Sequence, residues 1–169
     1  MNTLIIDNFL SKKERFGVNT LIIDNFLSKE ECNFLINFYK SNENKSFLFR
    51  DIYPIQLYLD DTRVNFLVKK LEATSKLFNS KVDWFQIIKW PTGSYQDLHF
   101  DSASDKTTLS SITYLNENFE GGQTYYEDGT SIQPITGRGL FFDGNFHKHG
   151  VKKVTKDIRY VIAAWYKKL

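Results

Sequence analysis

The residues best suited to chemistry are two histidines and an aspartate from distant parts of the chain. His99 and Asp101 flank Phe100, so on a strand they would share one face while Phe100 entered the core. His147 and His149 are likewise one residue apart and would share a face. Two histidines and one carboxylate form the facial ligand set of non-haem Fe(II) sites. An H-x-D pair alone is a common pattern, and the distant second histidine makes a metal site the stronger interpretation.

A cation on the predicted last strand, residues 157–168, could serve the same site. In this strand Arg159, Val161, Ala163 and Trp165 alternate onto one face. An arginine in an otherwise apolar row is costly to bury unless an anion meets it. Since a guanidinium binds a carboxylate through two parallel hydrogen bonds, Arg159 could hold an anionic molecule that also chelates the metal. An internal ion pair with Asp or Glu is the alternative.

Strand pairing near the C-terminus suggests which of the two histidines lies near this arginine. If residues 146–151 and 157–165 form an antiparallel hairpin centred near Val154, His149 faces Arg159 and His147 faces Val161. His149 would then lie where the metal and the anion share one ligand. The centre of this hairpin is assumed, so both histidines remain candidates on this argument.

The elements that must position these residues change in type along the chain. Ser28 and Glu31 have the spacing of a capping box, which predicts a helix over residues 29–40. A second helix is predicted after Asp61, where apolar residues recur at helical spacing as far as Phe78. From residue 83 onward, about eight short apolar runs separated by turn residues predict strands. Two helices followed by strands predict an antiparallel β-sandwich or jelly roll backed by helices.

Composition limits the class of protein. The chain has 169 residues, 41% of them hydrophobic and 25% charged, which predicts one globular domain. The net charge is +2 and the lysines are scattered, so no nucleic-acid partner is expected. No membrane span or signal peptide is predicted, and Cys32 is the only cysteine, so the expected location is cytoplasmic.

One sequence repeat lies near the N-terminus. The eleven residues NTLIIDNFLSK occur at 2–12 and again at 19–29. The second copy leads directly into the predicted first helix, so we interpret residues 1–18 as a duplicated extension and 19–169 as the single domain. A recent duplication explains the repeat, and an added edge strand for dimerisation is the alternative. A monomer or a homodimer is expected.

Several motifs, in order, resemble the prolyl 4-hydroxylase-like branch of the 2-oxoglutarate- and Fe(II)-dependent oxygenases. LIIDNFLSKEEC resembles the opening strand and first helix of that family, and HFD matches its H-x-D motif. TYLNENFEGGQTYY matches Y-L-N followed by G-G-E-T-x-F, with Gln123 in place of Glu, and PITGRGLFF matches P-x-x-G-x-x-x-x-F. In the family, Val stands five residues after the second metal-binding His, and Lys or Arg stands ten residues after it. Val154 and Arg159 have these offsets from His149, and not from His147.

The resemblance implies an α+β fold that is mainly β: a double-stranded β-helix, or jelly roll, with two supporting N-terminal helices. It implies that His99, Asp101 and His149 bind Fe(II) and that Arg159 binds the distal carboxylate of 2-oxoglutarate. Other implied co-substrate contacts are Tyr114, Thr124, Trp165 and Trp90. Tyr114 and Trp165 could instead be core residues, and Trp90 stands where many relatives have Tyr. Gln96 also stands where relatives commonly have Tyr, and His147 would be a bystander or would hydrogen-bond a metal ligand.

The activity implied by the resemblance is hydroxylation with Fe(II), 2-oxoglutarate and O₂, with ascorbate as a further candidate cofactor. A prolyl residue of a peptide or protein is the favoured substrate, and a free amino acid or other small molecule is an alternative. A non-catalytic jelly-roll binding module and a Zn or Mn enzyme independent of 2-oxoglutarate are the rival classes. The aromatic segment 47–59 could form a lid or peptide groove, or could pack against the sheet.

Overall fold

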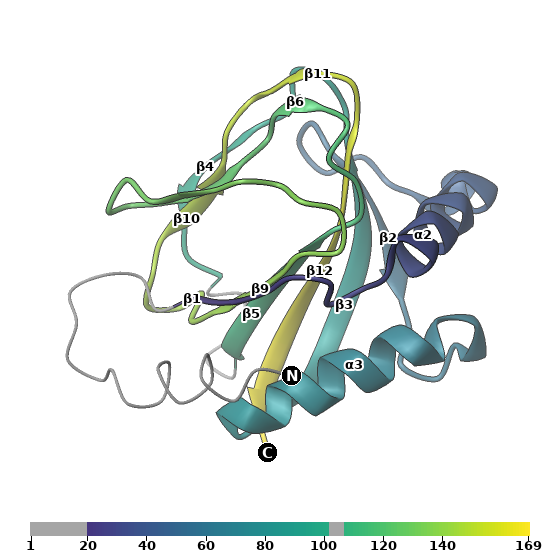
Figure 1. Ribbon diagram of the computed structural model, residues 1–169, viewed down its shortest axis with the longest axis vertical. Helices are drawn as coiled ribbons and strands as arrows, with labels where there is room; N and C mark the ends of the chain where they lie inside the picture. The colour runs from purple at the N-terminus through teal and green to yellow at the C-terminus, as the bar shows by residue number, and fades with distance from the viewer. Residues whose placement is uncertain (1–19, 102–106) are drawn as a thin grey trace.

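The computed structural model describes residues 20–101 and 107–169, so the extension 1–18, with the first copy of the repeat, lies outside the described residues. Strands dominate, and every strand pairing among the described residues is antiparallel (Figure 1). The large sheet has the order β1 (Thr20–Ile23), β9 (Gly139–Phe142), β5 (Thr107–Tyr114), β12 (Arg159–Lys168), β3 (Ser80–Trp90), β2 (Tyr53–Leu57). The small sheet has the order β4 (Gln96–His99), β10 (His149–Val151), β7 (Thr124–Tyr126), β8 (Ser131–Ile132). A third pair joins β11 (Val154–Lys156) to β6 (Glu120–Gly121). This arrangement is consistent with the expected jelly roll.

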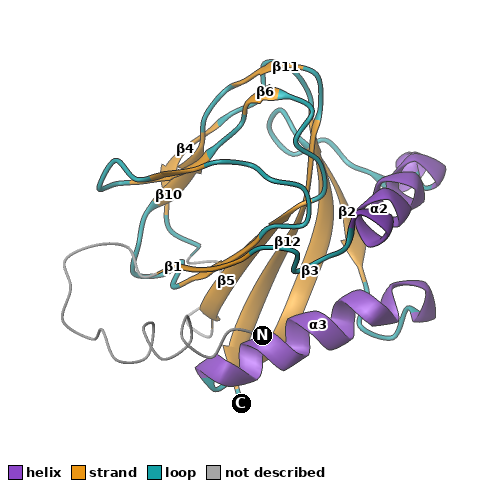
Figure 2. Ribbon diagram, viewed as in Figure 1, coloured by secondary structure: helices purple, strands orange, loops and turns teal. Residues whose placement is uncertain are grey.

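Both predicted helices are present, as α2 (Lys29–Ser41) and α3 (Asn65–Ser75), and they lie along one side of the large sheet (Figure 2). The capping box is confirmed, because the Ser28 hydroxyl accepts from the Glu31 N–H and the Glu31 carboxylate accepts from the Ser28 N–H. One-turn 3₁₀ segments at Glu43–Lys45, Thr62–Val64 and Lys76–Phe78 extend or follow the helices. No helix of the described residues is long and apolar enough to cross a membrane.

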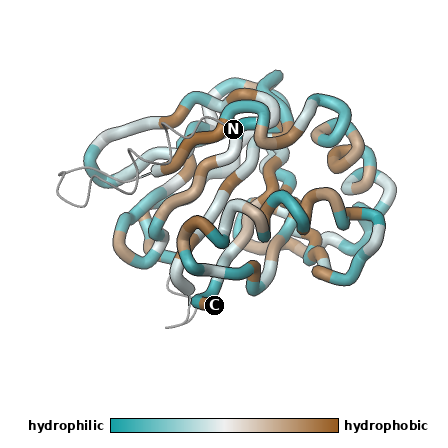
Figure 3. The backbone as a smooth tube through the Cα atoms, turned by 60° about the horizontal axis from the view of Figure 1, so that its bottom comes forward, coloured by the Kyte–Doolittle hydropathy of each residue, from teal (hydrophilic) through white to brown (hydrophobic). Residues whose placement is uncertain are grey.

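The predicted alternation along β12 is confirmed, and it separates two apolar cores. Tyr160, Ile162, Ala164 and Tyr166 pack in the core beneath the helices. Val161 and Ala163 belong to the core on the opposite face, between the large and small sheets. Hydrophobic residues, drawn in brown, accordingly lie along the strands of the sheets, and many outer turns consist of hydrophilic residues, drawn in teal (Figure 3).

The predicted hairpin between residues 146–151 and 157–165 is wrong. β10 lies in the small sheet between β4 and β7, whereas β12 lies in the large sheet between β3 and β5. The intervening residues form β11, which pairs with β6, so the chain passes from one sheet to the other instead of turning back. His149 and Arg159 therefore approach each other across the two sheets and not along one ladder.

The segment 47–59 divides between the two roles considered for it. Tyr53–Leu57 is edge strand β2, which pairs with β3, and an edge position tolerates Pro54. Ile55 and Leu57 are buried in the core beneath the helices. Phe47 and Phe49, by contrast, remain about half exposed and line a cavity of the opposite face.

Candidate metal and co-substrate site

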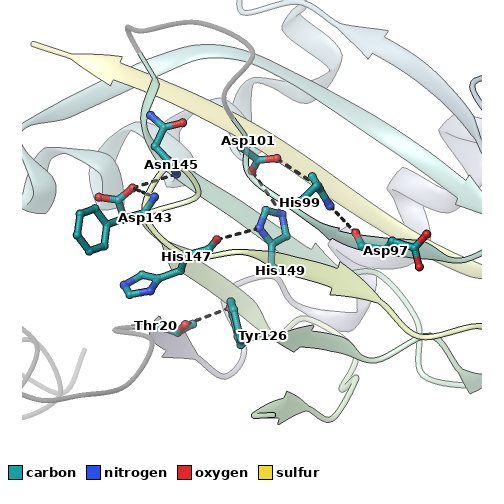
Figure 4. A network of polar contacts seen from close by, with 10 residues as sticks. Thr20, Asp97, His99, Asp101, Tyr126, Asp143, Asn145, His147 and His149 are labelled. Carbon is teal, nitrogen blue, oxygen red and sulfur yellow. Dashed lines mark hydrogen bonds and ion pairs between the residues drawn. The ribbon is translucent and has the colours of Figure 1, made fainter. Parts of the chain in front are cut away.

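The structure brings His99, Asp101 and His149 together at the facing ends of two paired strands. His99 ends β4, His149 begins β10, and the two residues are directly opposite in the ladder. One potential ligand atom of each of the three residues lies within 4.8 Å of the others, a spacing that could hold a metal ion. The Asp101 carboxylate lies between both rings, 3.6 Å from His99 Nε2 and 3.5 Å from His149 Nε2 (Figure 4).

Backbone carbonyls contact the other ring nitrogen of each histidine. His99 Nδ1 is 2.8 Å from the Asp97 carbonyl oxygen, and His149 Nδ1 is 3.5 Å from the carbonyl oxygen of His147. An N–H at Nδ1 would leave Nε2 as the ligand atom on the Asp101 side. The side chain of His147 is not among the three clustered groups, so this residue contacts the site through its main chain.

Burial is the largest influence on the pKa of each of the three groups, but the net directions differ. Burial lowers the pKa of His149, against the opposing attraction of Asp101. For His99, burial is outweighed by the Asp101 carboxylate and the Asp97 carbonyl, and its pKa is raised. For Asp101, burial is outweighed by both histidines and by Ser110, and its pKa is lowered. Asp101 is therefore ionised and His149 neutral near pH 7, the protonation states that metal binding requires.

Arg159 is fully buried and lies in the same cavity as the three clustered residues. None of its three guanidinium nitrogens has a hydrogen-bond partner in the described parts of the chain, so the alternative of an internal ion pair is not realised there. Its guanidinium lies 4.9 Å from the centre of the Trp90 ring and 5.3 Å from that of Tyr114. Burial lowers the pKa of Arg159, against the opposing effect of Tyr114, but an arginine stays charged. A buried charge with three unused donors requires an anionic acceptor.

Trp90 and Trp165 also line this cavity, which has a volume of about 550 Å³. The indole nitrogen of Trp90 is buried and has no partner among the described residues, so a second unused donor lies beside Arg159. Trp165 stacks on Trp84 with the ring centres 3.8 Å apart. The cavity therefore extends along the face of β12 from a cationic end to an aromatic end.

Tyr114 and Thr124 lie behind Arg159 and are not among the residues that line the cavity. Both are fully buried. The Tyr114 hydroxyl donates to Thr124 Oγ1 at 2.7 Å and accepts from the Thr124 N–H at 3.1 Å. The Tyr114 ring contacts the guanidinium, so these two residues support the arginine in this structure. A direct contact of either hydroxyl with a co-substrate remains a prediction.

The prediction that Phe100 enters the core is wrong. Phe100 is 42% exposed and lines the cavity. Strand β4 ends at His99, so the alternation of faces does not continue to Phe100. The Asp101 N–H instead donates to the carbonyl of Gly144 at 2.8 Å, which draws Asp101 toward His149.

Two glycines that were not singled out from the sequence leave space for this site. A Cβ atom on Gly144 would lie 2.8 Å from Asp101 Oδ2, and one on Gly122 would lie 2.9 Å from Arg159 Cδ. Such distances are below any ordinary carbon contact. The second glycine lies in the GGQT motif, and this contact gives a physical reason for its small size.

Gly144→Ala is expected to weaken Fe(II) binding by about tenfold or more, because changes next to metal ligands typically have an effect of this size. The added methyl group must displace the Asp101 carboxylate or the Ser110 side chain. Fe(II) affinity measured anaerobically by calorimetry tests this. Gly129→Ala is the control, since its Cβ meets open space although its positive φ of +86° strains an alanine. That variant should lose some stability but keep its metal affinity. Equal affinity in both variants would contradict the prediction.

Comparison with known proteins agrees with this geometry. The sequence model of the 2OG-Fe(II) oxygenase superfamily matches residues 85–167. A prolyl 3-hydroxylase 1 from Gallus gallus is 42% identical over 64 residues, which cover 34% of this chain and 9% of that protein. The chain thus matches only a small part of the curated relatives' length.

Solved structures share the fold over nearly the whole chain. A prolyl-4-hydroxylase from Pseudomonas putida has a TM-score of 0.76 at 16% identity and covers 98% of both chains. A Trichoplax adhaerens prolyl hydroxylase, in complex with a peptide fragment of the hypoxia inducible factor oxygen degradation domain, has a TM-score of 0.78 at 21% identity, covering 98% of this chain and 88% of that one. A viral collagen prolyl hydroxylase from Paramecium bursaria Chlorella virus-1, solved with 2OG, has a TM-score of 0.73 at 21% identity and covers 89% of this chain and 96% of the other. Residues 85–167 therefore carry the sequence pattern of the 2OG-Fe(II) oxygenase superfamily, the chain has the fold of the solved prolyl hydroxylases, and the clustered His99, Asp101 and His149 fit the iron that this superfamily binds.

Proposed function

We propose that this chain hydroxylates a prolyl residue of a peptide or protein, using Fe(II), 2-oxoglutarate and O₂. The observation that carries the proposal is the buried, unpartnered guanidinium of Arg159 in the same cavity as the His99, Asp101 and His149 cluster. A metal-binding module would need only the cluster. The arginine adds a binding site for an anion that reaches the metal from inside the fold.

In this proposal each residue of the site has a separate task. His99, Asp101 and His149 hold Fe(II) with two nitrogens and one oxygen, the ligand set that leaves positions open for other molecules. Arg159 binds the distal carboxylate of 2-oxoglutarate, and the Trp90 N–H is available to the same oxygen atoms. The bound iron, with O₂ and 2-oxoglutarate, supplies the oxidation that hydroxylates a C–H bond and yields succinate and CO₂. The protein residues orient the reactants and exclude water.

The aromatic part of the cavity supports a peptide substrate. From Arg159 to Trp165, β12 spans seven residues, roughly 20 Å at the usual rise of a strand. A five-carbon co-substrate that joins Arg159 to the metal cluster does not fill a cavity of about 550 Å³, which leaves room along the aromatic wall for a second molecule. Aromatic walls are the common surface for proline-rich segments. The names of the matched proteins also favour a prolyl substrate, since they include prolyl hydroxylases and a complex with a peptide.

The test is incubation of the purified full chain with Fe(II), 2-oxoglutarate, O₂ and ascorbate, in the presence of proline-containing peptides or free amino acids. The expected result is peptide-dependent succinate formation together with a product heavier by one oxygen atom, located by tandem mass spectrometry. Product from a free amino acid and from no peptide would show that the substrate is a small molecule and not a peptide. Metal binding with no succinate under any condition would contradict the enzymatic proposal.

A further inference from the structure

Arg50 is a charged side chain of the cavity that the proposed reaction does not use. Among the described residues that line the cavity, the charged or ionisable ones besides Arg50 are the three clustered ligand candidates and Arg159. We propose that Arg50 selects peptide substrates that carry an acidic side chain beside the target residue. This inference rests on the proposed function and specifies its class of substrate.

The backbone holds Arg50 in a position that an arginine would not ordinarily adopt. Phe49 and Ile52 exchange two hydrogen bonds of 3.0 and 3.1 Å, so Arg50 and Asp51 form a two-residue hairpin turn. Arg50 is the first turn residue and has a φ of +55°, a conformation that favours glycine. An L-residue in this conformation costs about 1–2 kcal/mol. Strain of this kind on the wall of a functional cavity points to a role for the side chain.

The charge of Arg50 is also available for a ligand. No carboxylate of the described ranges lies within ion-pair distance of its guanidinium, in contrast to Arg63 and Arg138, which pair with Asp61 and Asp24. Its guanidinium contacts the ring of Phe49, 5.5 Å from the ring centre, and its charge acts on His99 in the direction that lowers the pKa of that ring. A cation lying over an aromatic ring can still form a bidentate pair with an incoming carboxylate.

The surroundings of Arg50 complement an apolar target next to an acidic group. Phe47 and Phe49 are each 49% exposed and Phe100 is 42% exposed, so the cavity entrance presents aromatic surface. Lys148 lies 5.3 Å from the centre of the Phe100 ring, but it does not line the cavity. Apart from Asp101, no described residue that lines the cavity has a carboxylate that would repel an acidic peptide.

The test uses three short peptides that differ only in the residues flanking one central proline, which are Glu, Gln or Lys. With saturating Fe(II) and 2-oxoglutarate, kcat/KM is measured for the wild type, Arg50→Gln and Arg50→Glu. The wild type is expected to prefer the Glu peptide over the Gln peptide by about twofold to fivefold, the upper part of the range of a partly screened ion pair. Arg50→Gln should lose this preference, Arg50→Glu should prefer the Lys peptide, and added salt should reduce both effects. Equal values for all three peptides with the wild type, or an unchanged preference in Arg50→Gln, would overturn the inference.

Two further variants separate the charge of Arg50 from its effect on folding and from other charges. Arg50→Gly relieves the positive φ, so it should melt at the wild-type temperature or above while losing the acidic preference. Lys148→Gln should keep that preference. If Lys148→Gln loses it and Arg50→Gln does not, the assignment to Arg50 is wrong. Product from no peptide at all would refute the proposed prolyl hydroxylation itself, and this inference with it, whereas product from all peptides at equal rates refutes only this inference.

Discussion

Replacing His149 by alanine is expected to reduce Fe(II) affinity by at least about 100-fold, while His147→Ala changes it by no more than a few fold. Loss of a metal ligand costs more than the tenfold to 100-fold typical of residues that support ligands. The His149 ring lies 3.5 Å from Asp101 and opposite His99, and it is almost fully buried. His147 contacts the cluster only through its carbonyl, which alanine retains. Calorimetry with Fe(II) under anaerobic conditions gives both affinities.

The two histidine variants control for each other, because they change the same residue type two positions apart. Circular dichroism should show that both fold. Removal of the His149 ring leaves a cavity beside Phe142, whose ring centre is 4.7 Å away, so a modest loss of stability is expected as well. If His147→Ala abolished metal binding and His149→Ala spared it, the proposed ligand set would be incorrect.

Arg159→Met is expected to raise the KM for 2-oxoglutarate by about 100-fold or more, the scale measured when one partner of a buried, hydrogen-bonded charge pair is removed. Methionine fills similar space without a charge. Because the Arg159 guanidinium has no partner among the described residues, this variant should fold at least as well as the wild type in the absence of 2-oxoglutarate. A buried internal ion pair would predict a large loss of stability instead.

Thermal unfolding separates the two effects of Arg159→Met. In the presence of a non-oxidisable divalent metal, 2-oxoglutarate should raise the Tm of the wild type by binding the folded state, and should leave that of Arg159→Met nearly unchanged. Arg138→Met is the matched control, since Arg138 is paired with Asp24 outside the cavity. It should keep the wild-type response to 2-oxoglutarate. An unchanged KM in Arg159→Met would favour a metal enzyme that does not use this co-substrate.

Features of the fold that depend on local patterns were predictable. The capping box at Ser28 and Glu31 predicts the start of α2 because its hydrogen bonds join residues three apart in the chain. The alternation along β12 predicts which of its side chains share the cavity face with Arg159, since the period of a strand is two residues. The types of the three clustered residues and the Arg159 charge likewise predict metal and anion chemistry.

Other features depend on which strands pair, and a strand pattern does not specify its partner. The sequence is compatible with a hairpin between β10 and β12, but β11 pairs with β6 and places them in different sheets. The same nonlocal packing brings Arg50 from a turn before β2 to the wall of the cavity. The sequence by itself therefore determined the chemical groups and, along β12, the face on which they lie. Only the tertiary structure decided which of them meet, because contacts between distant strands depend on the packing of the whole chain.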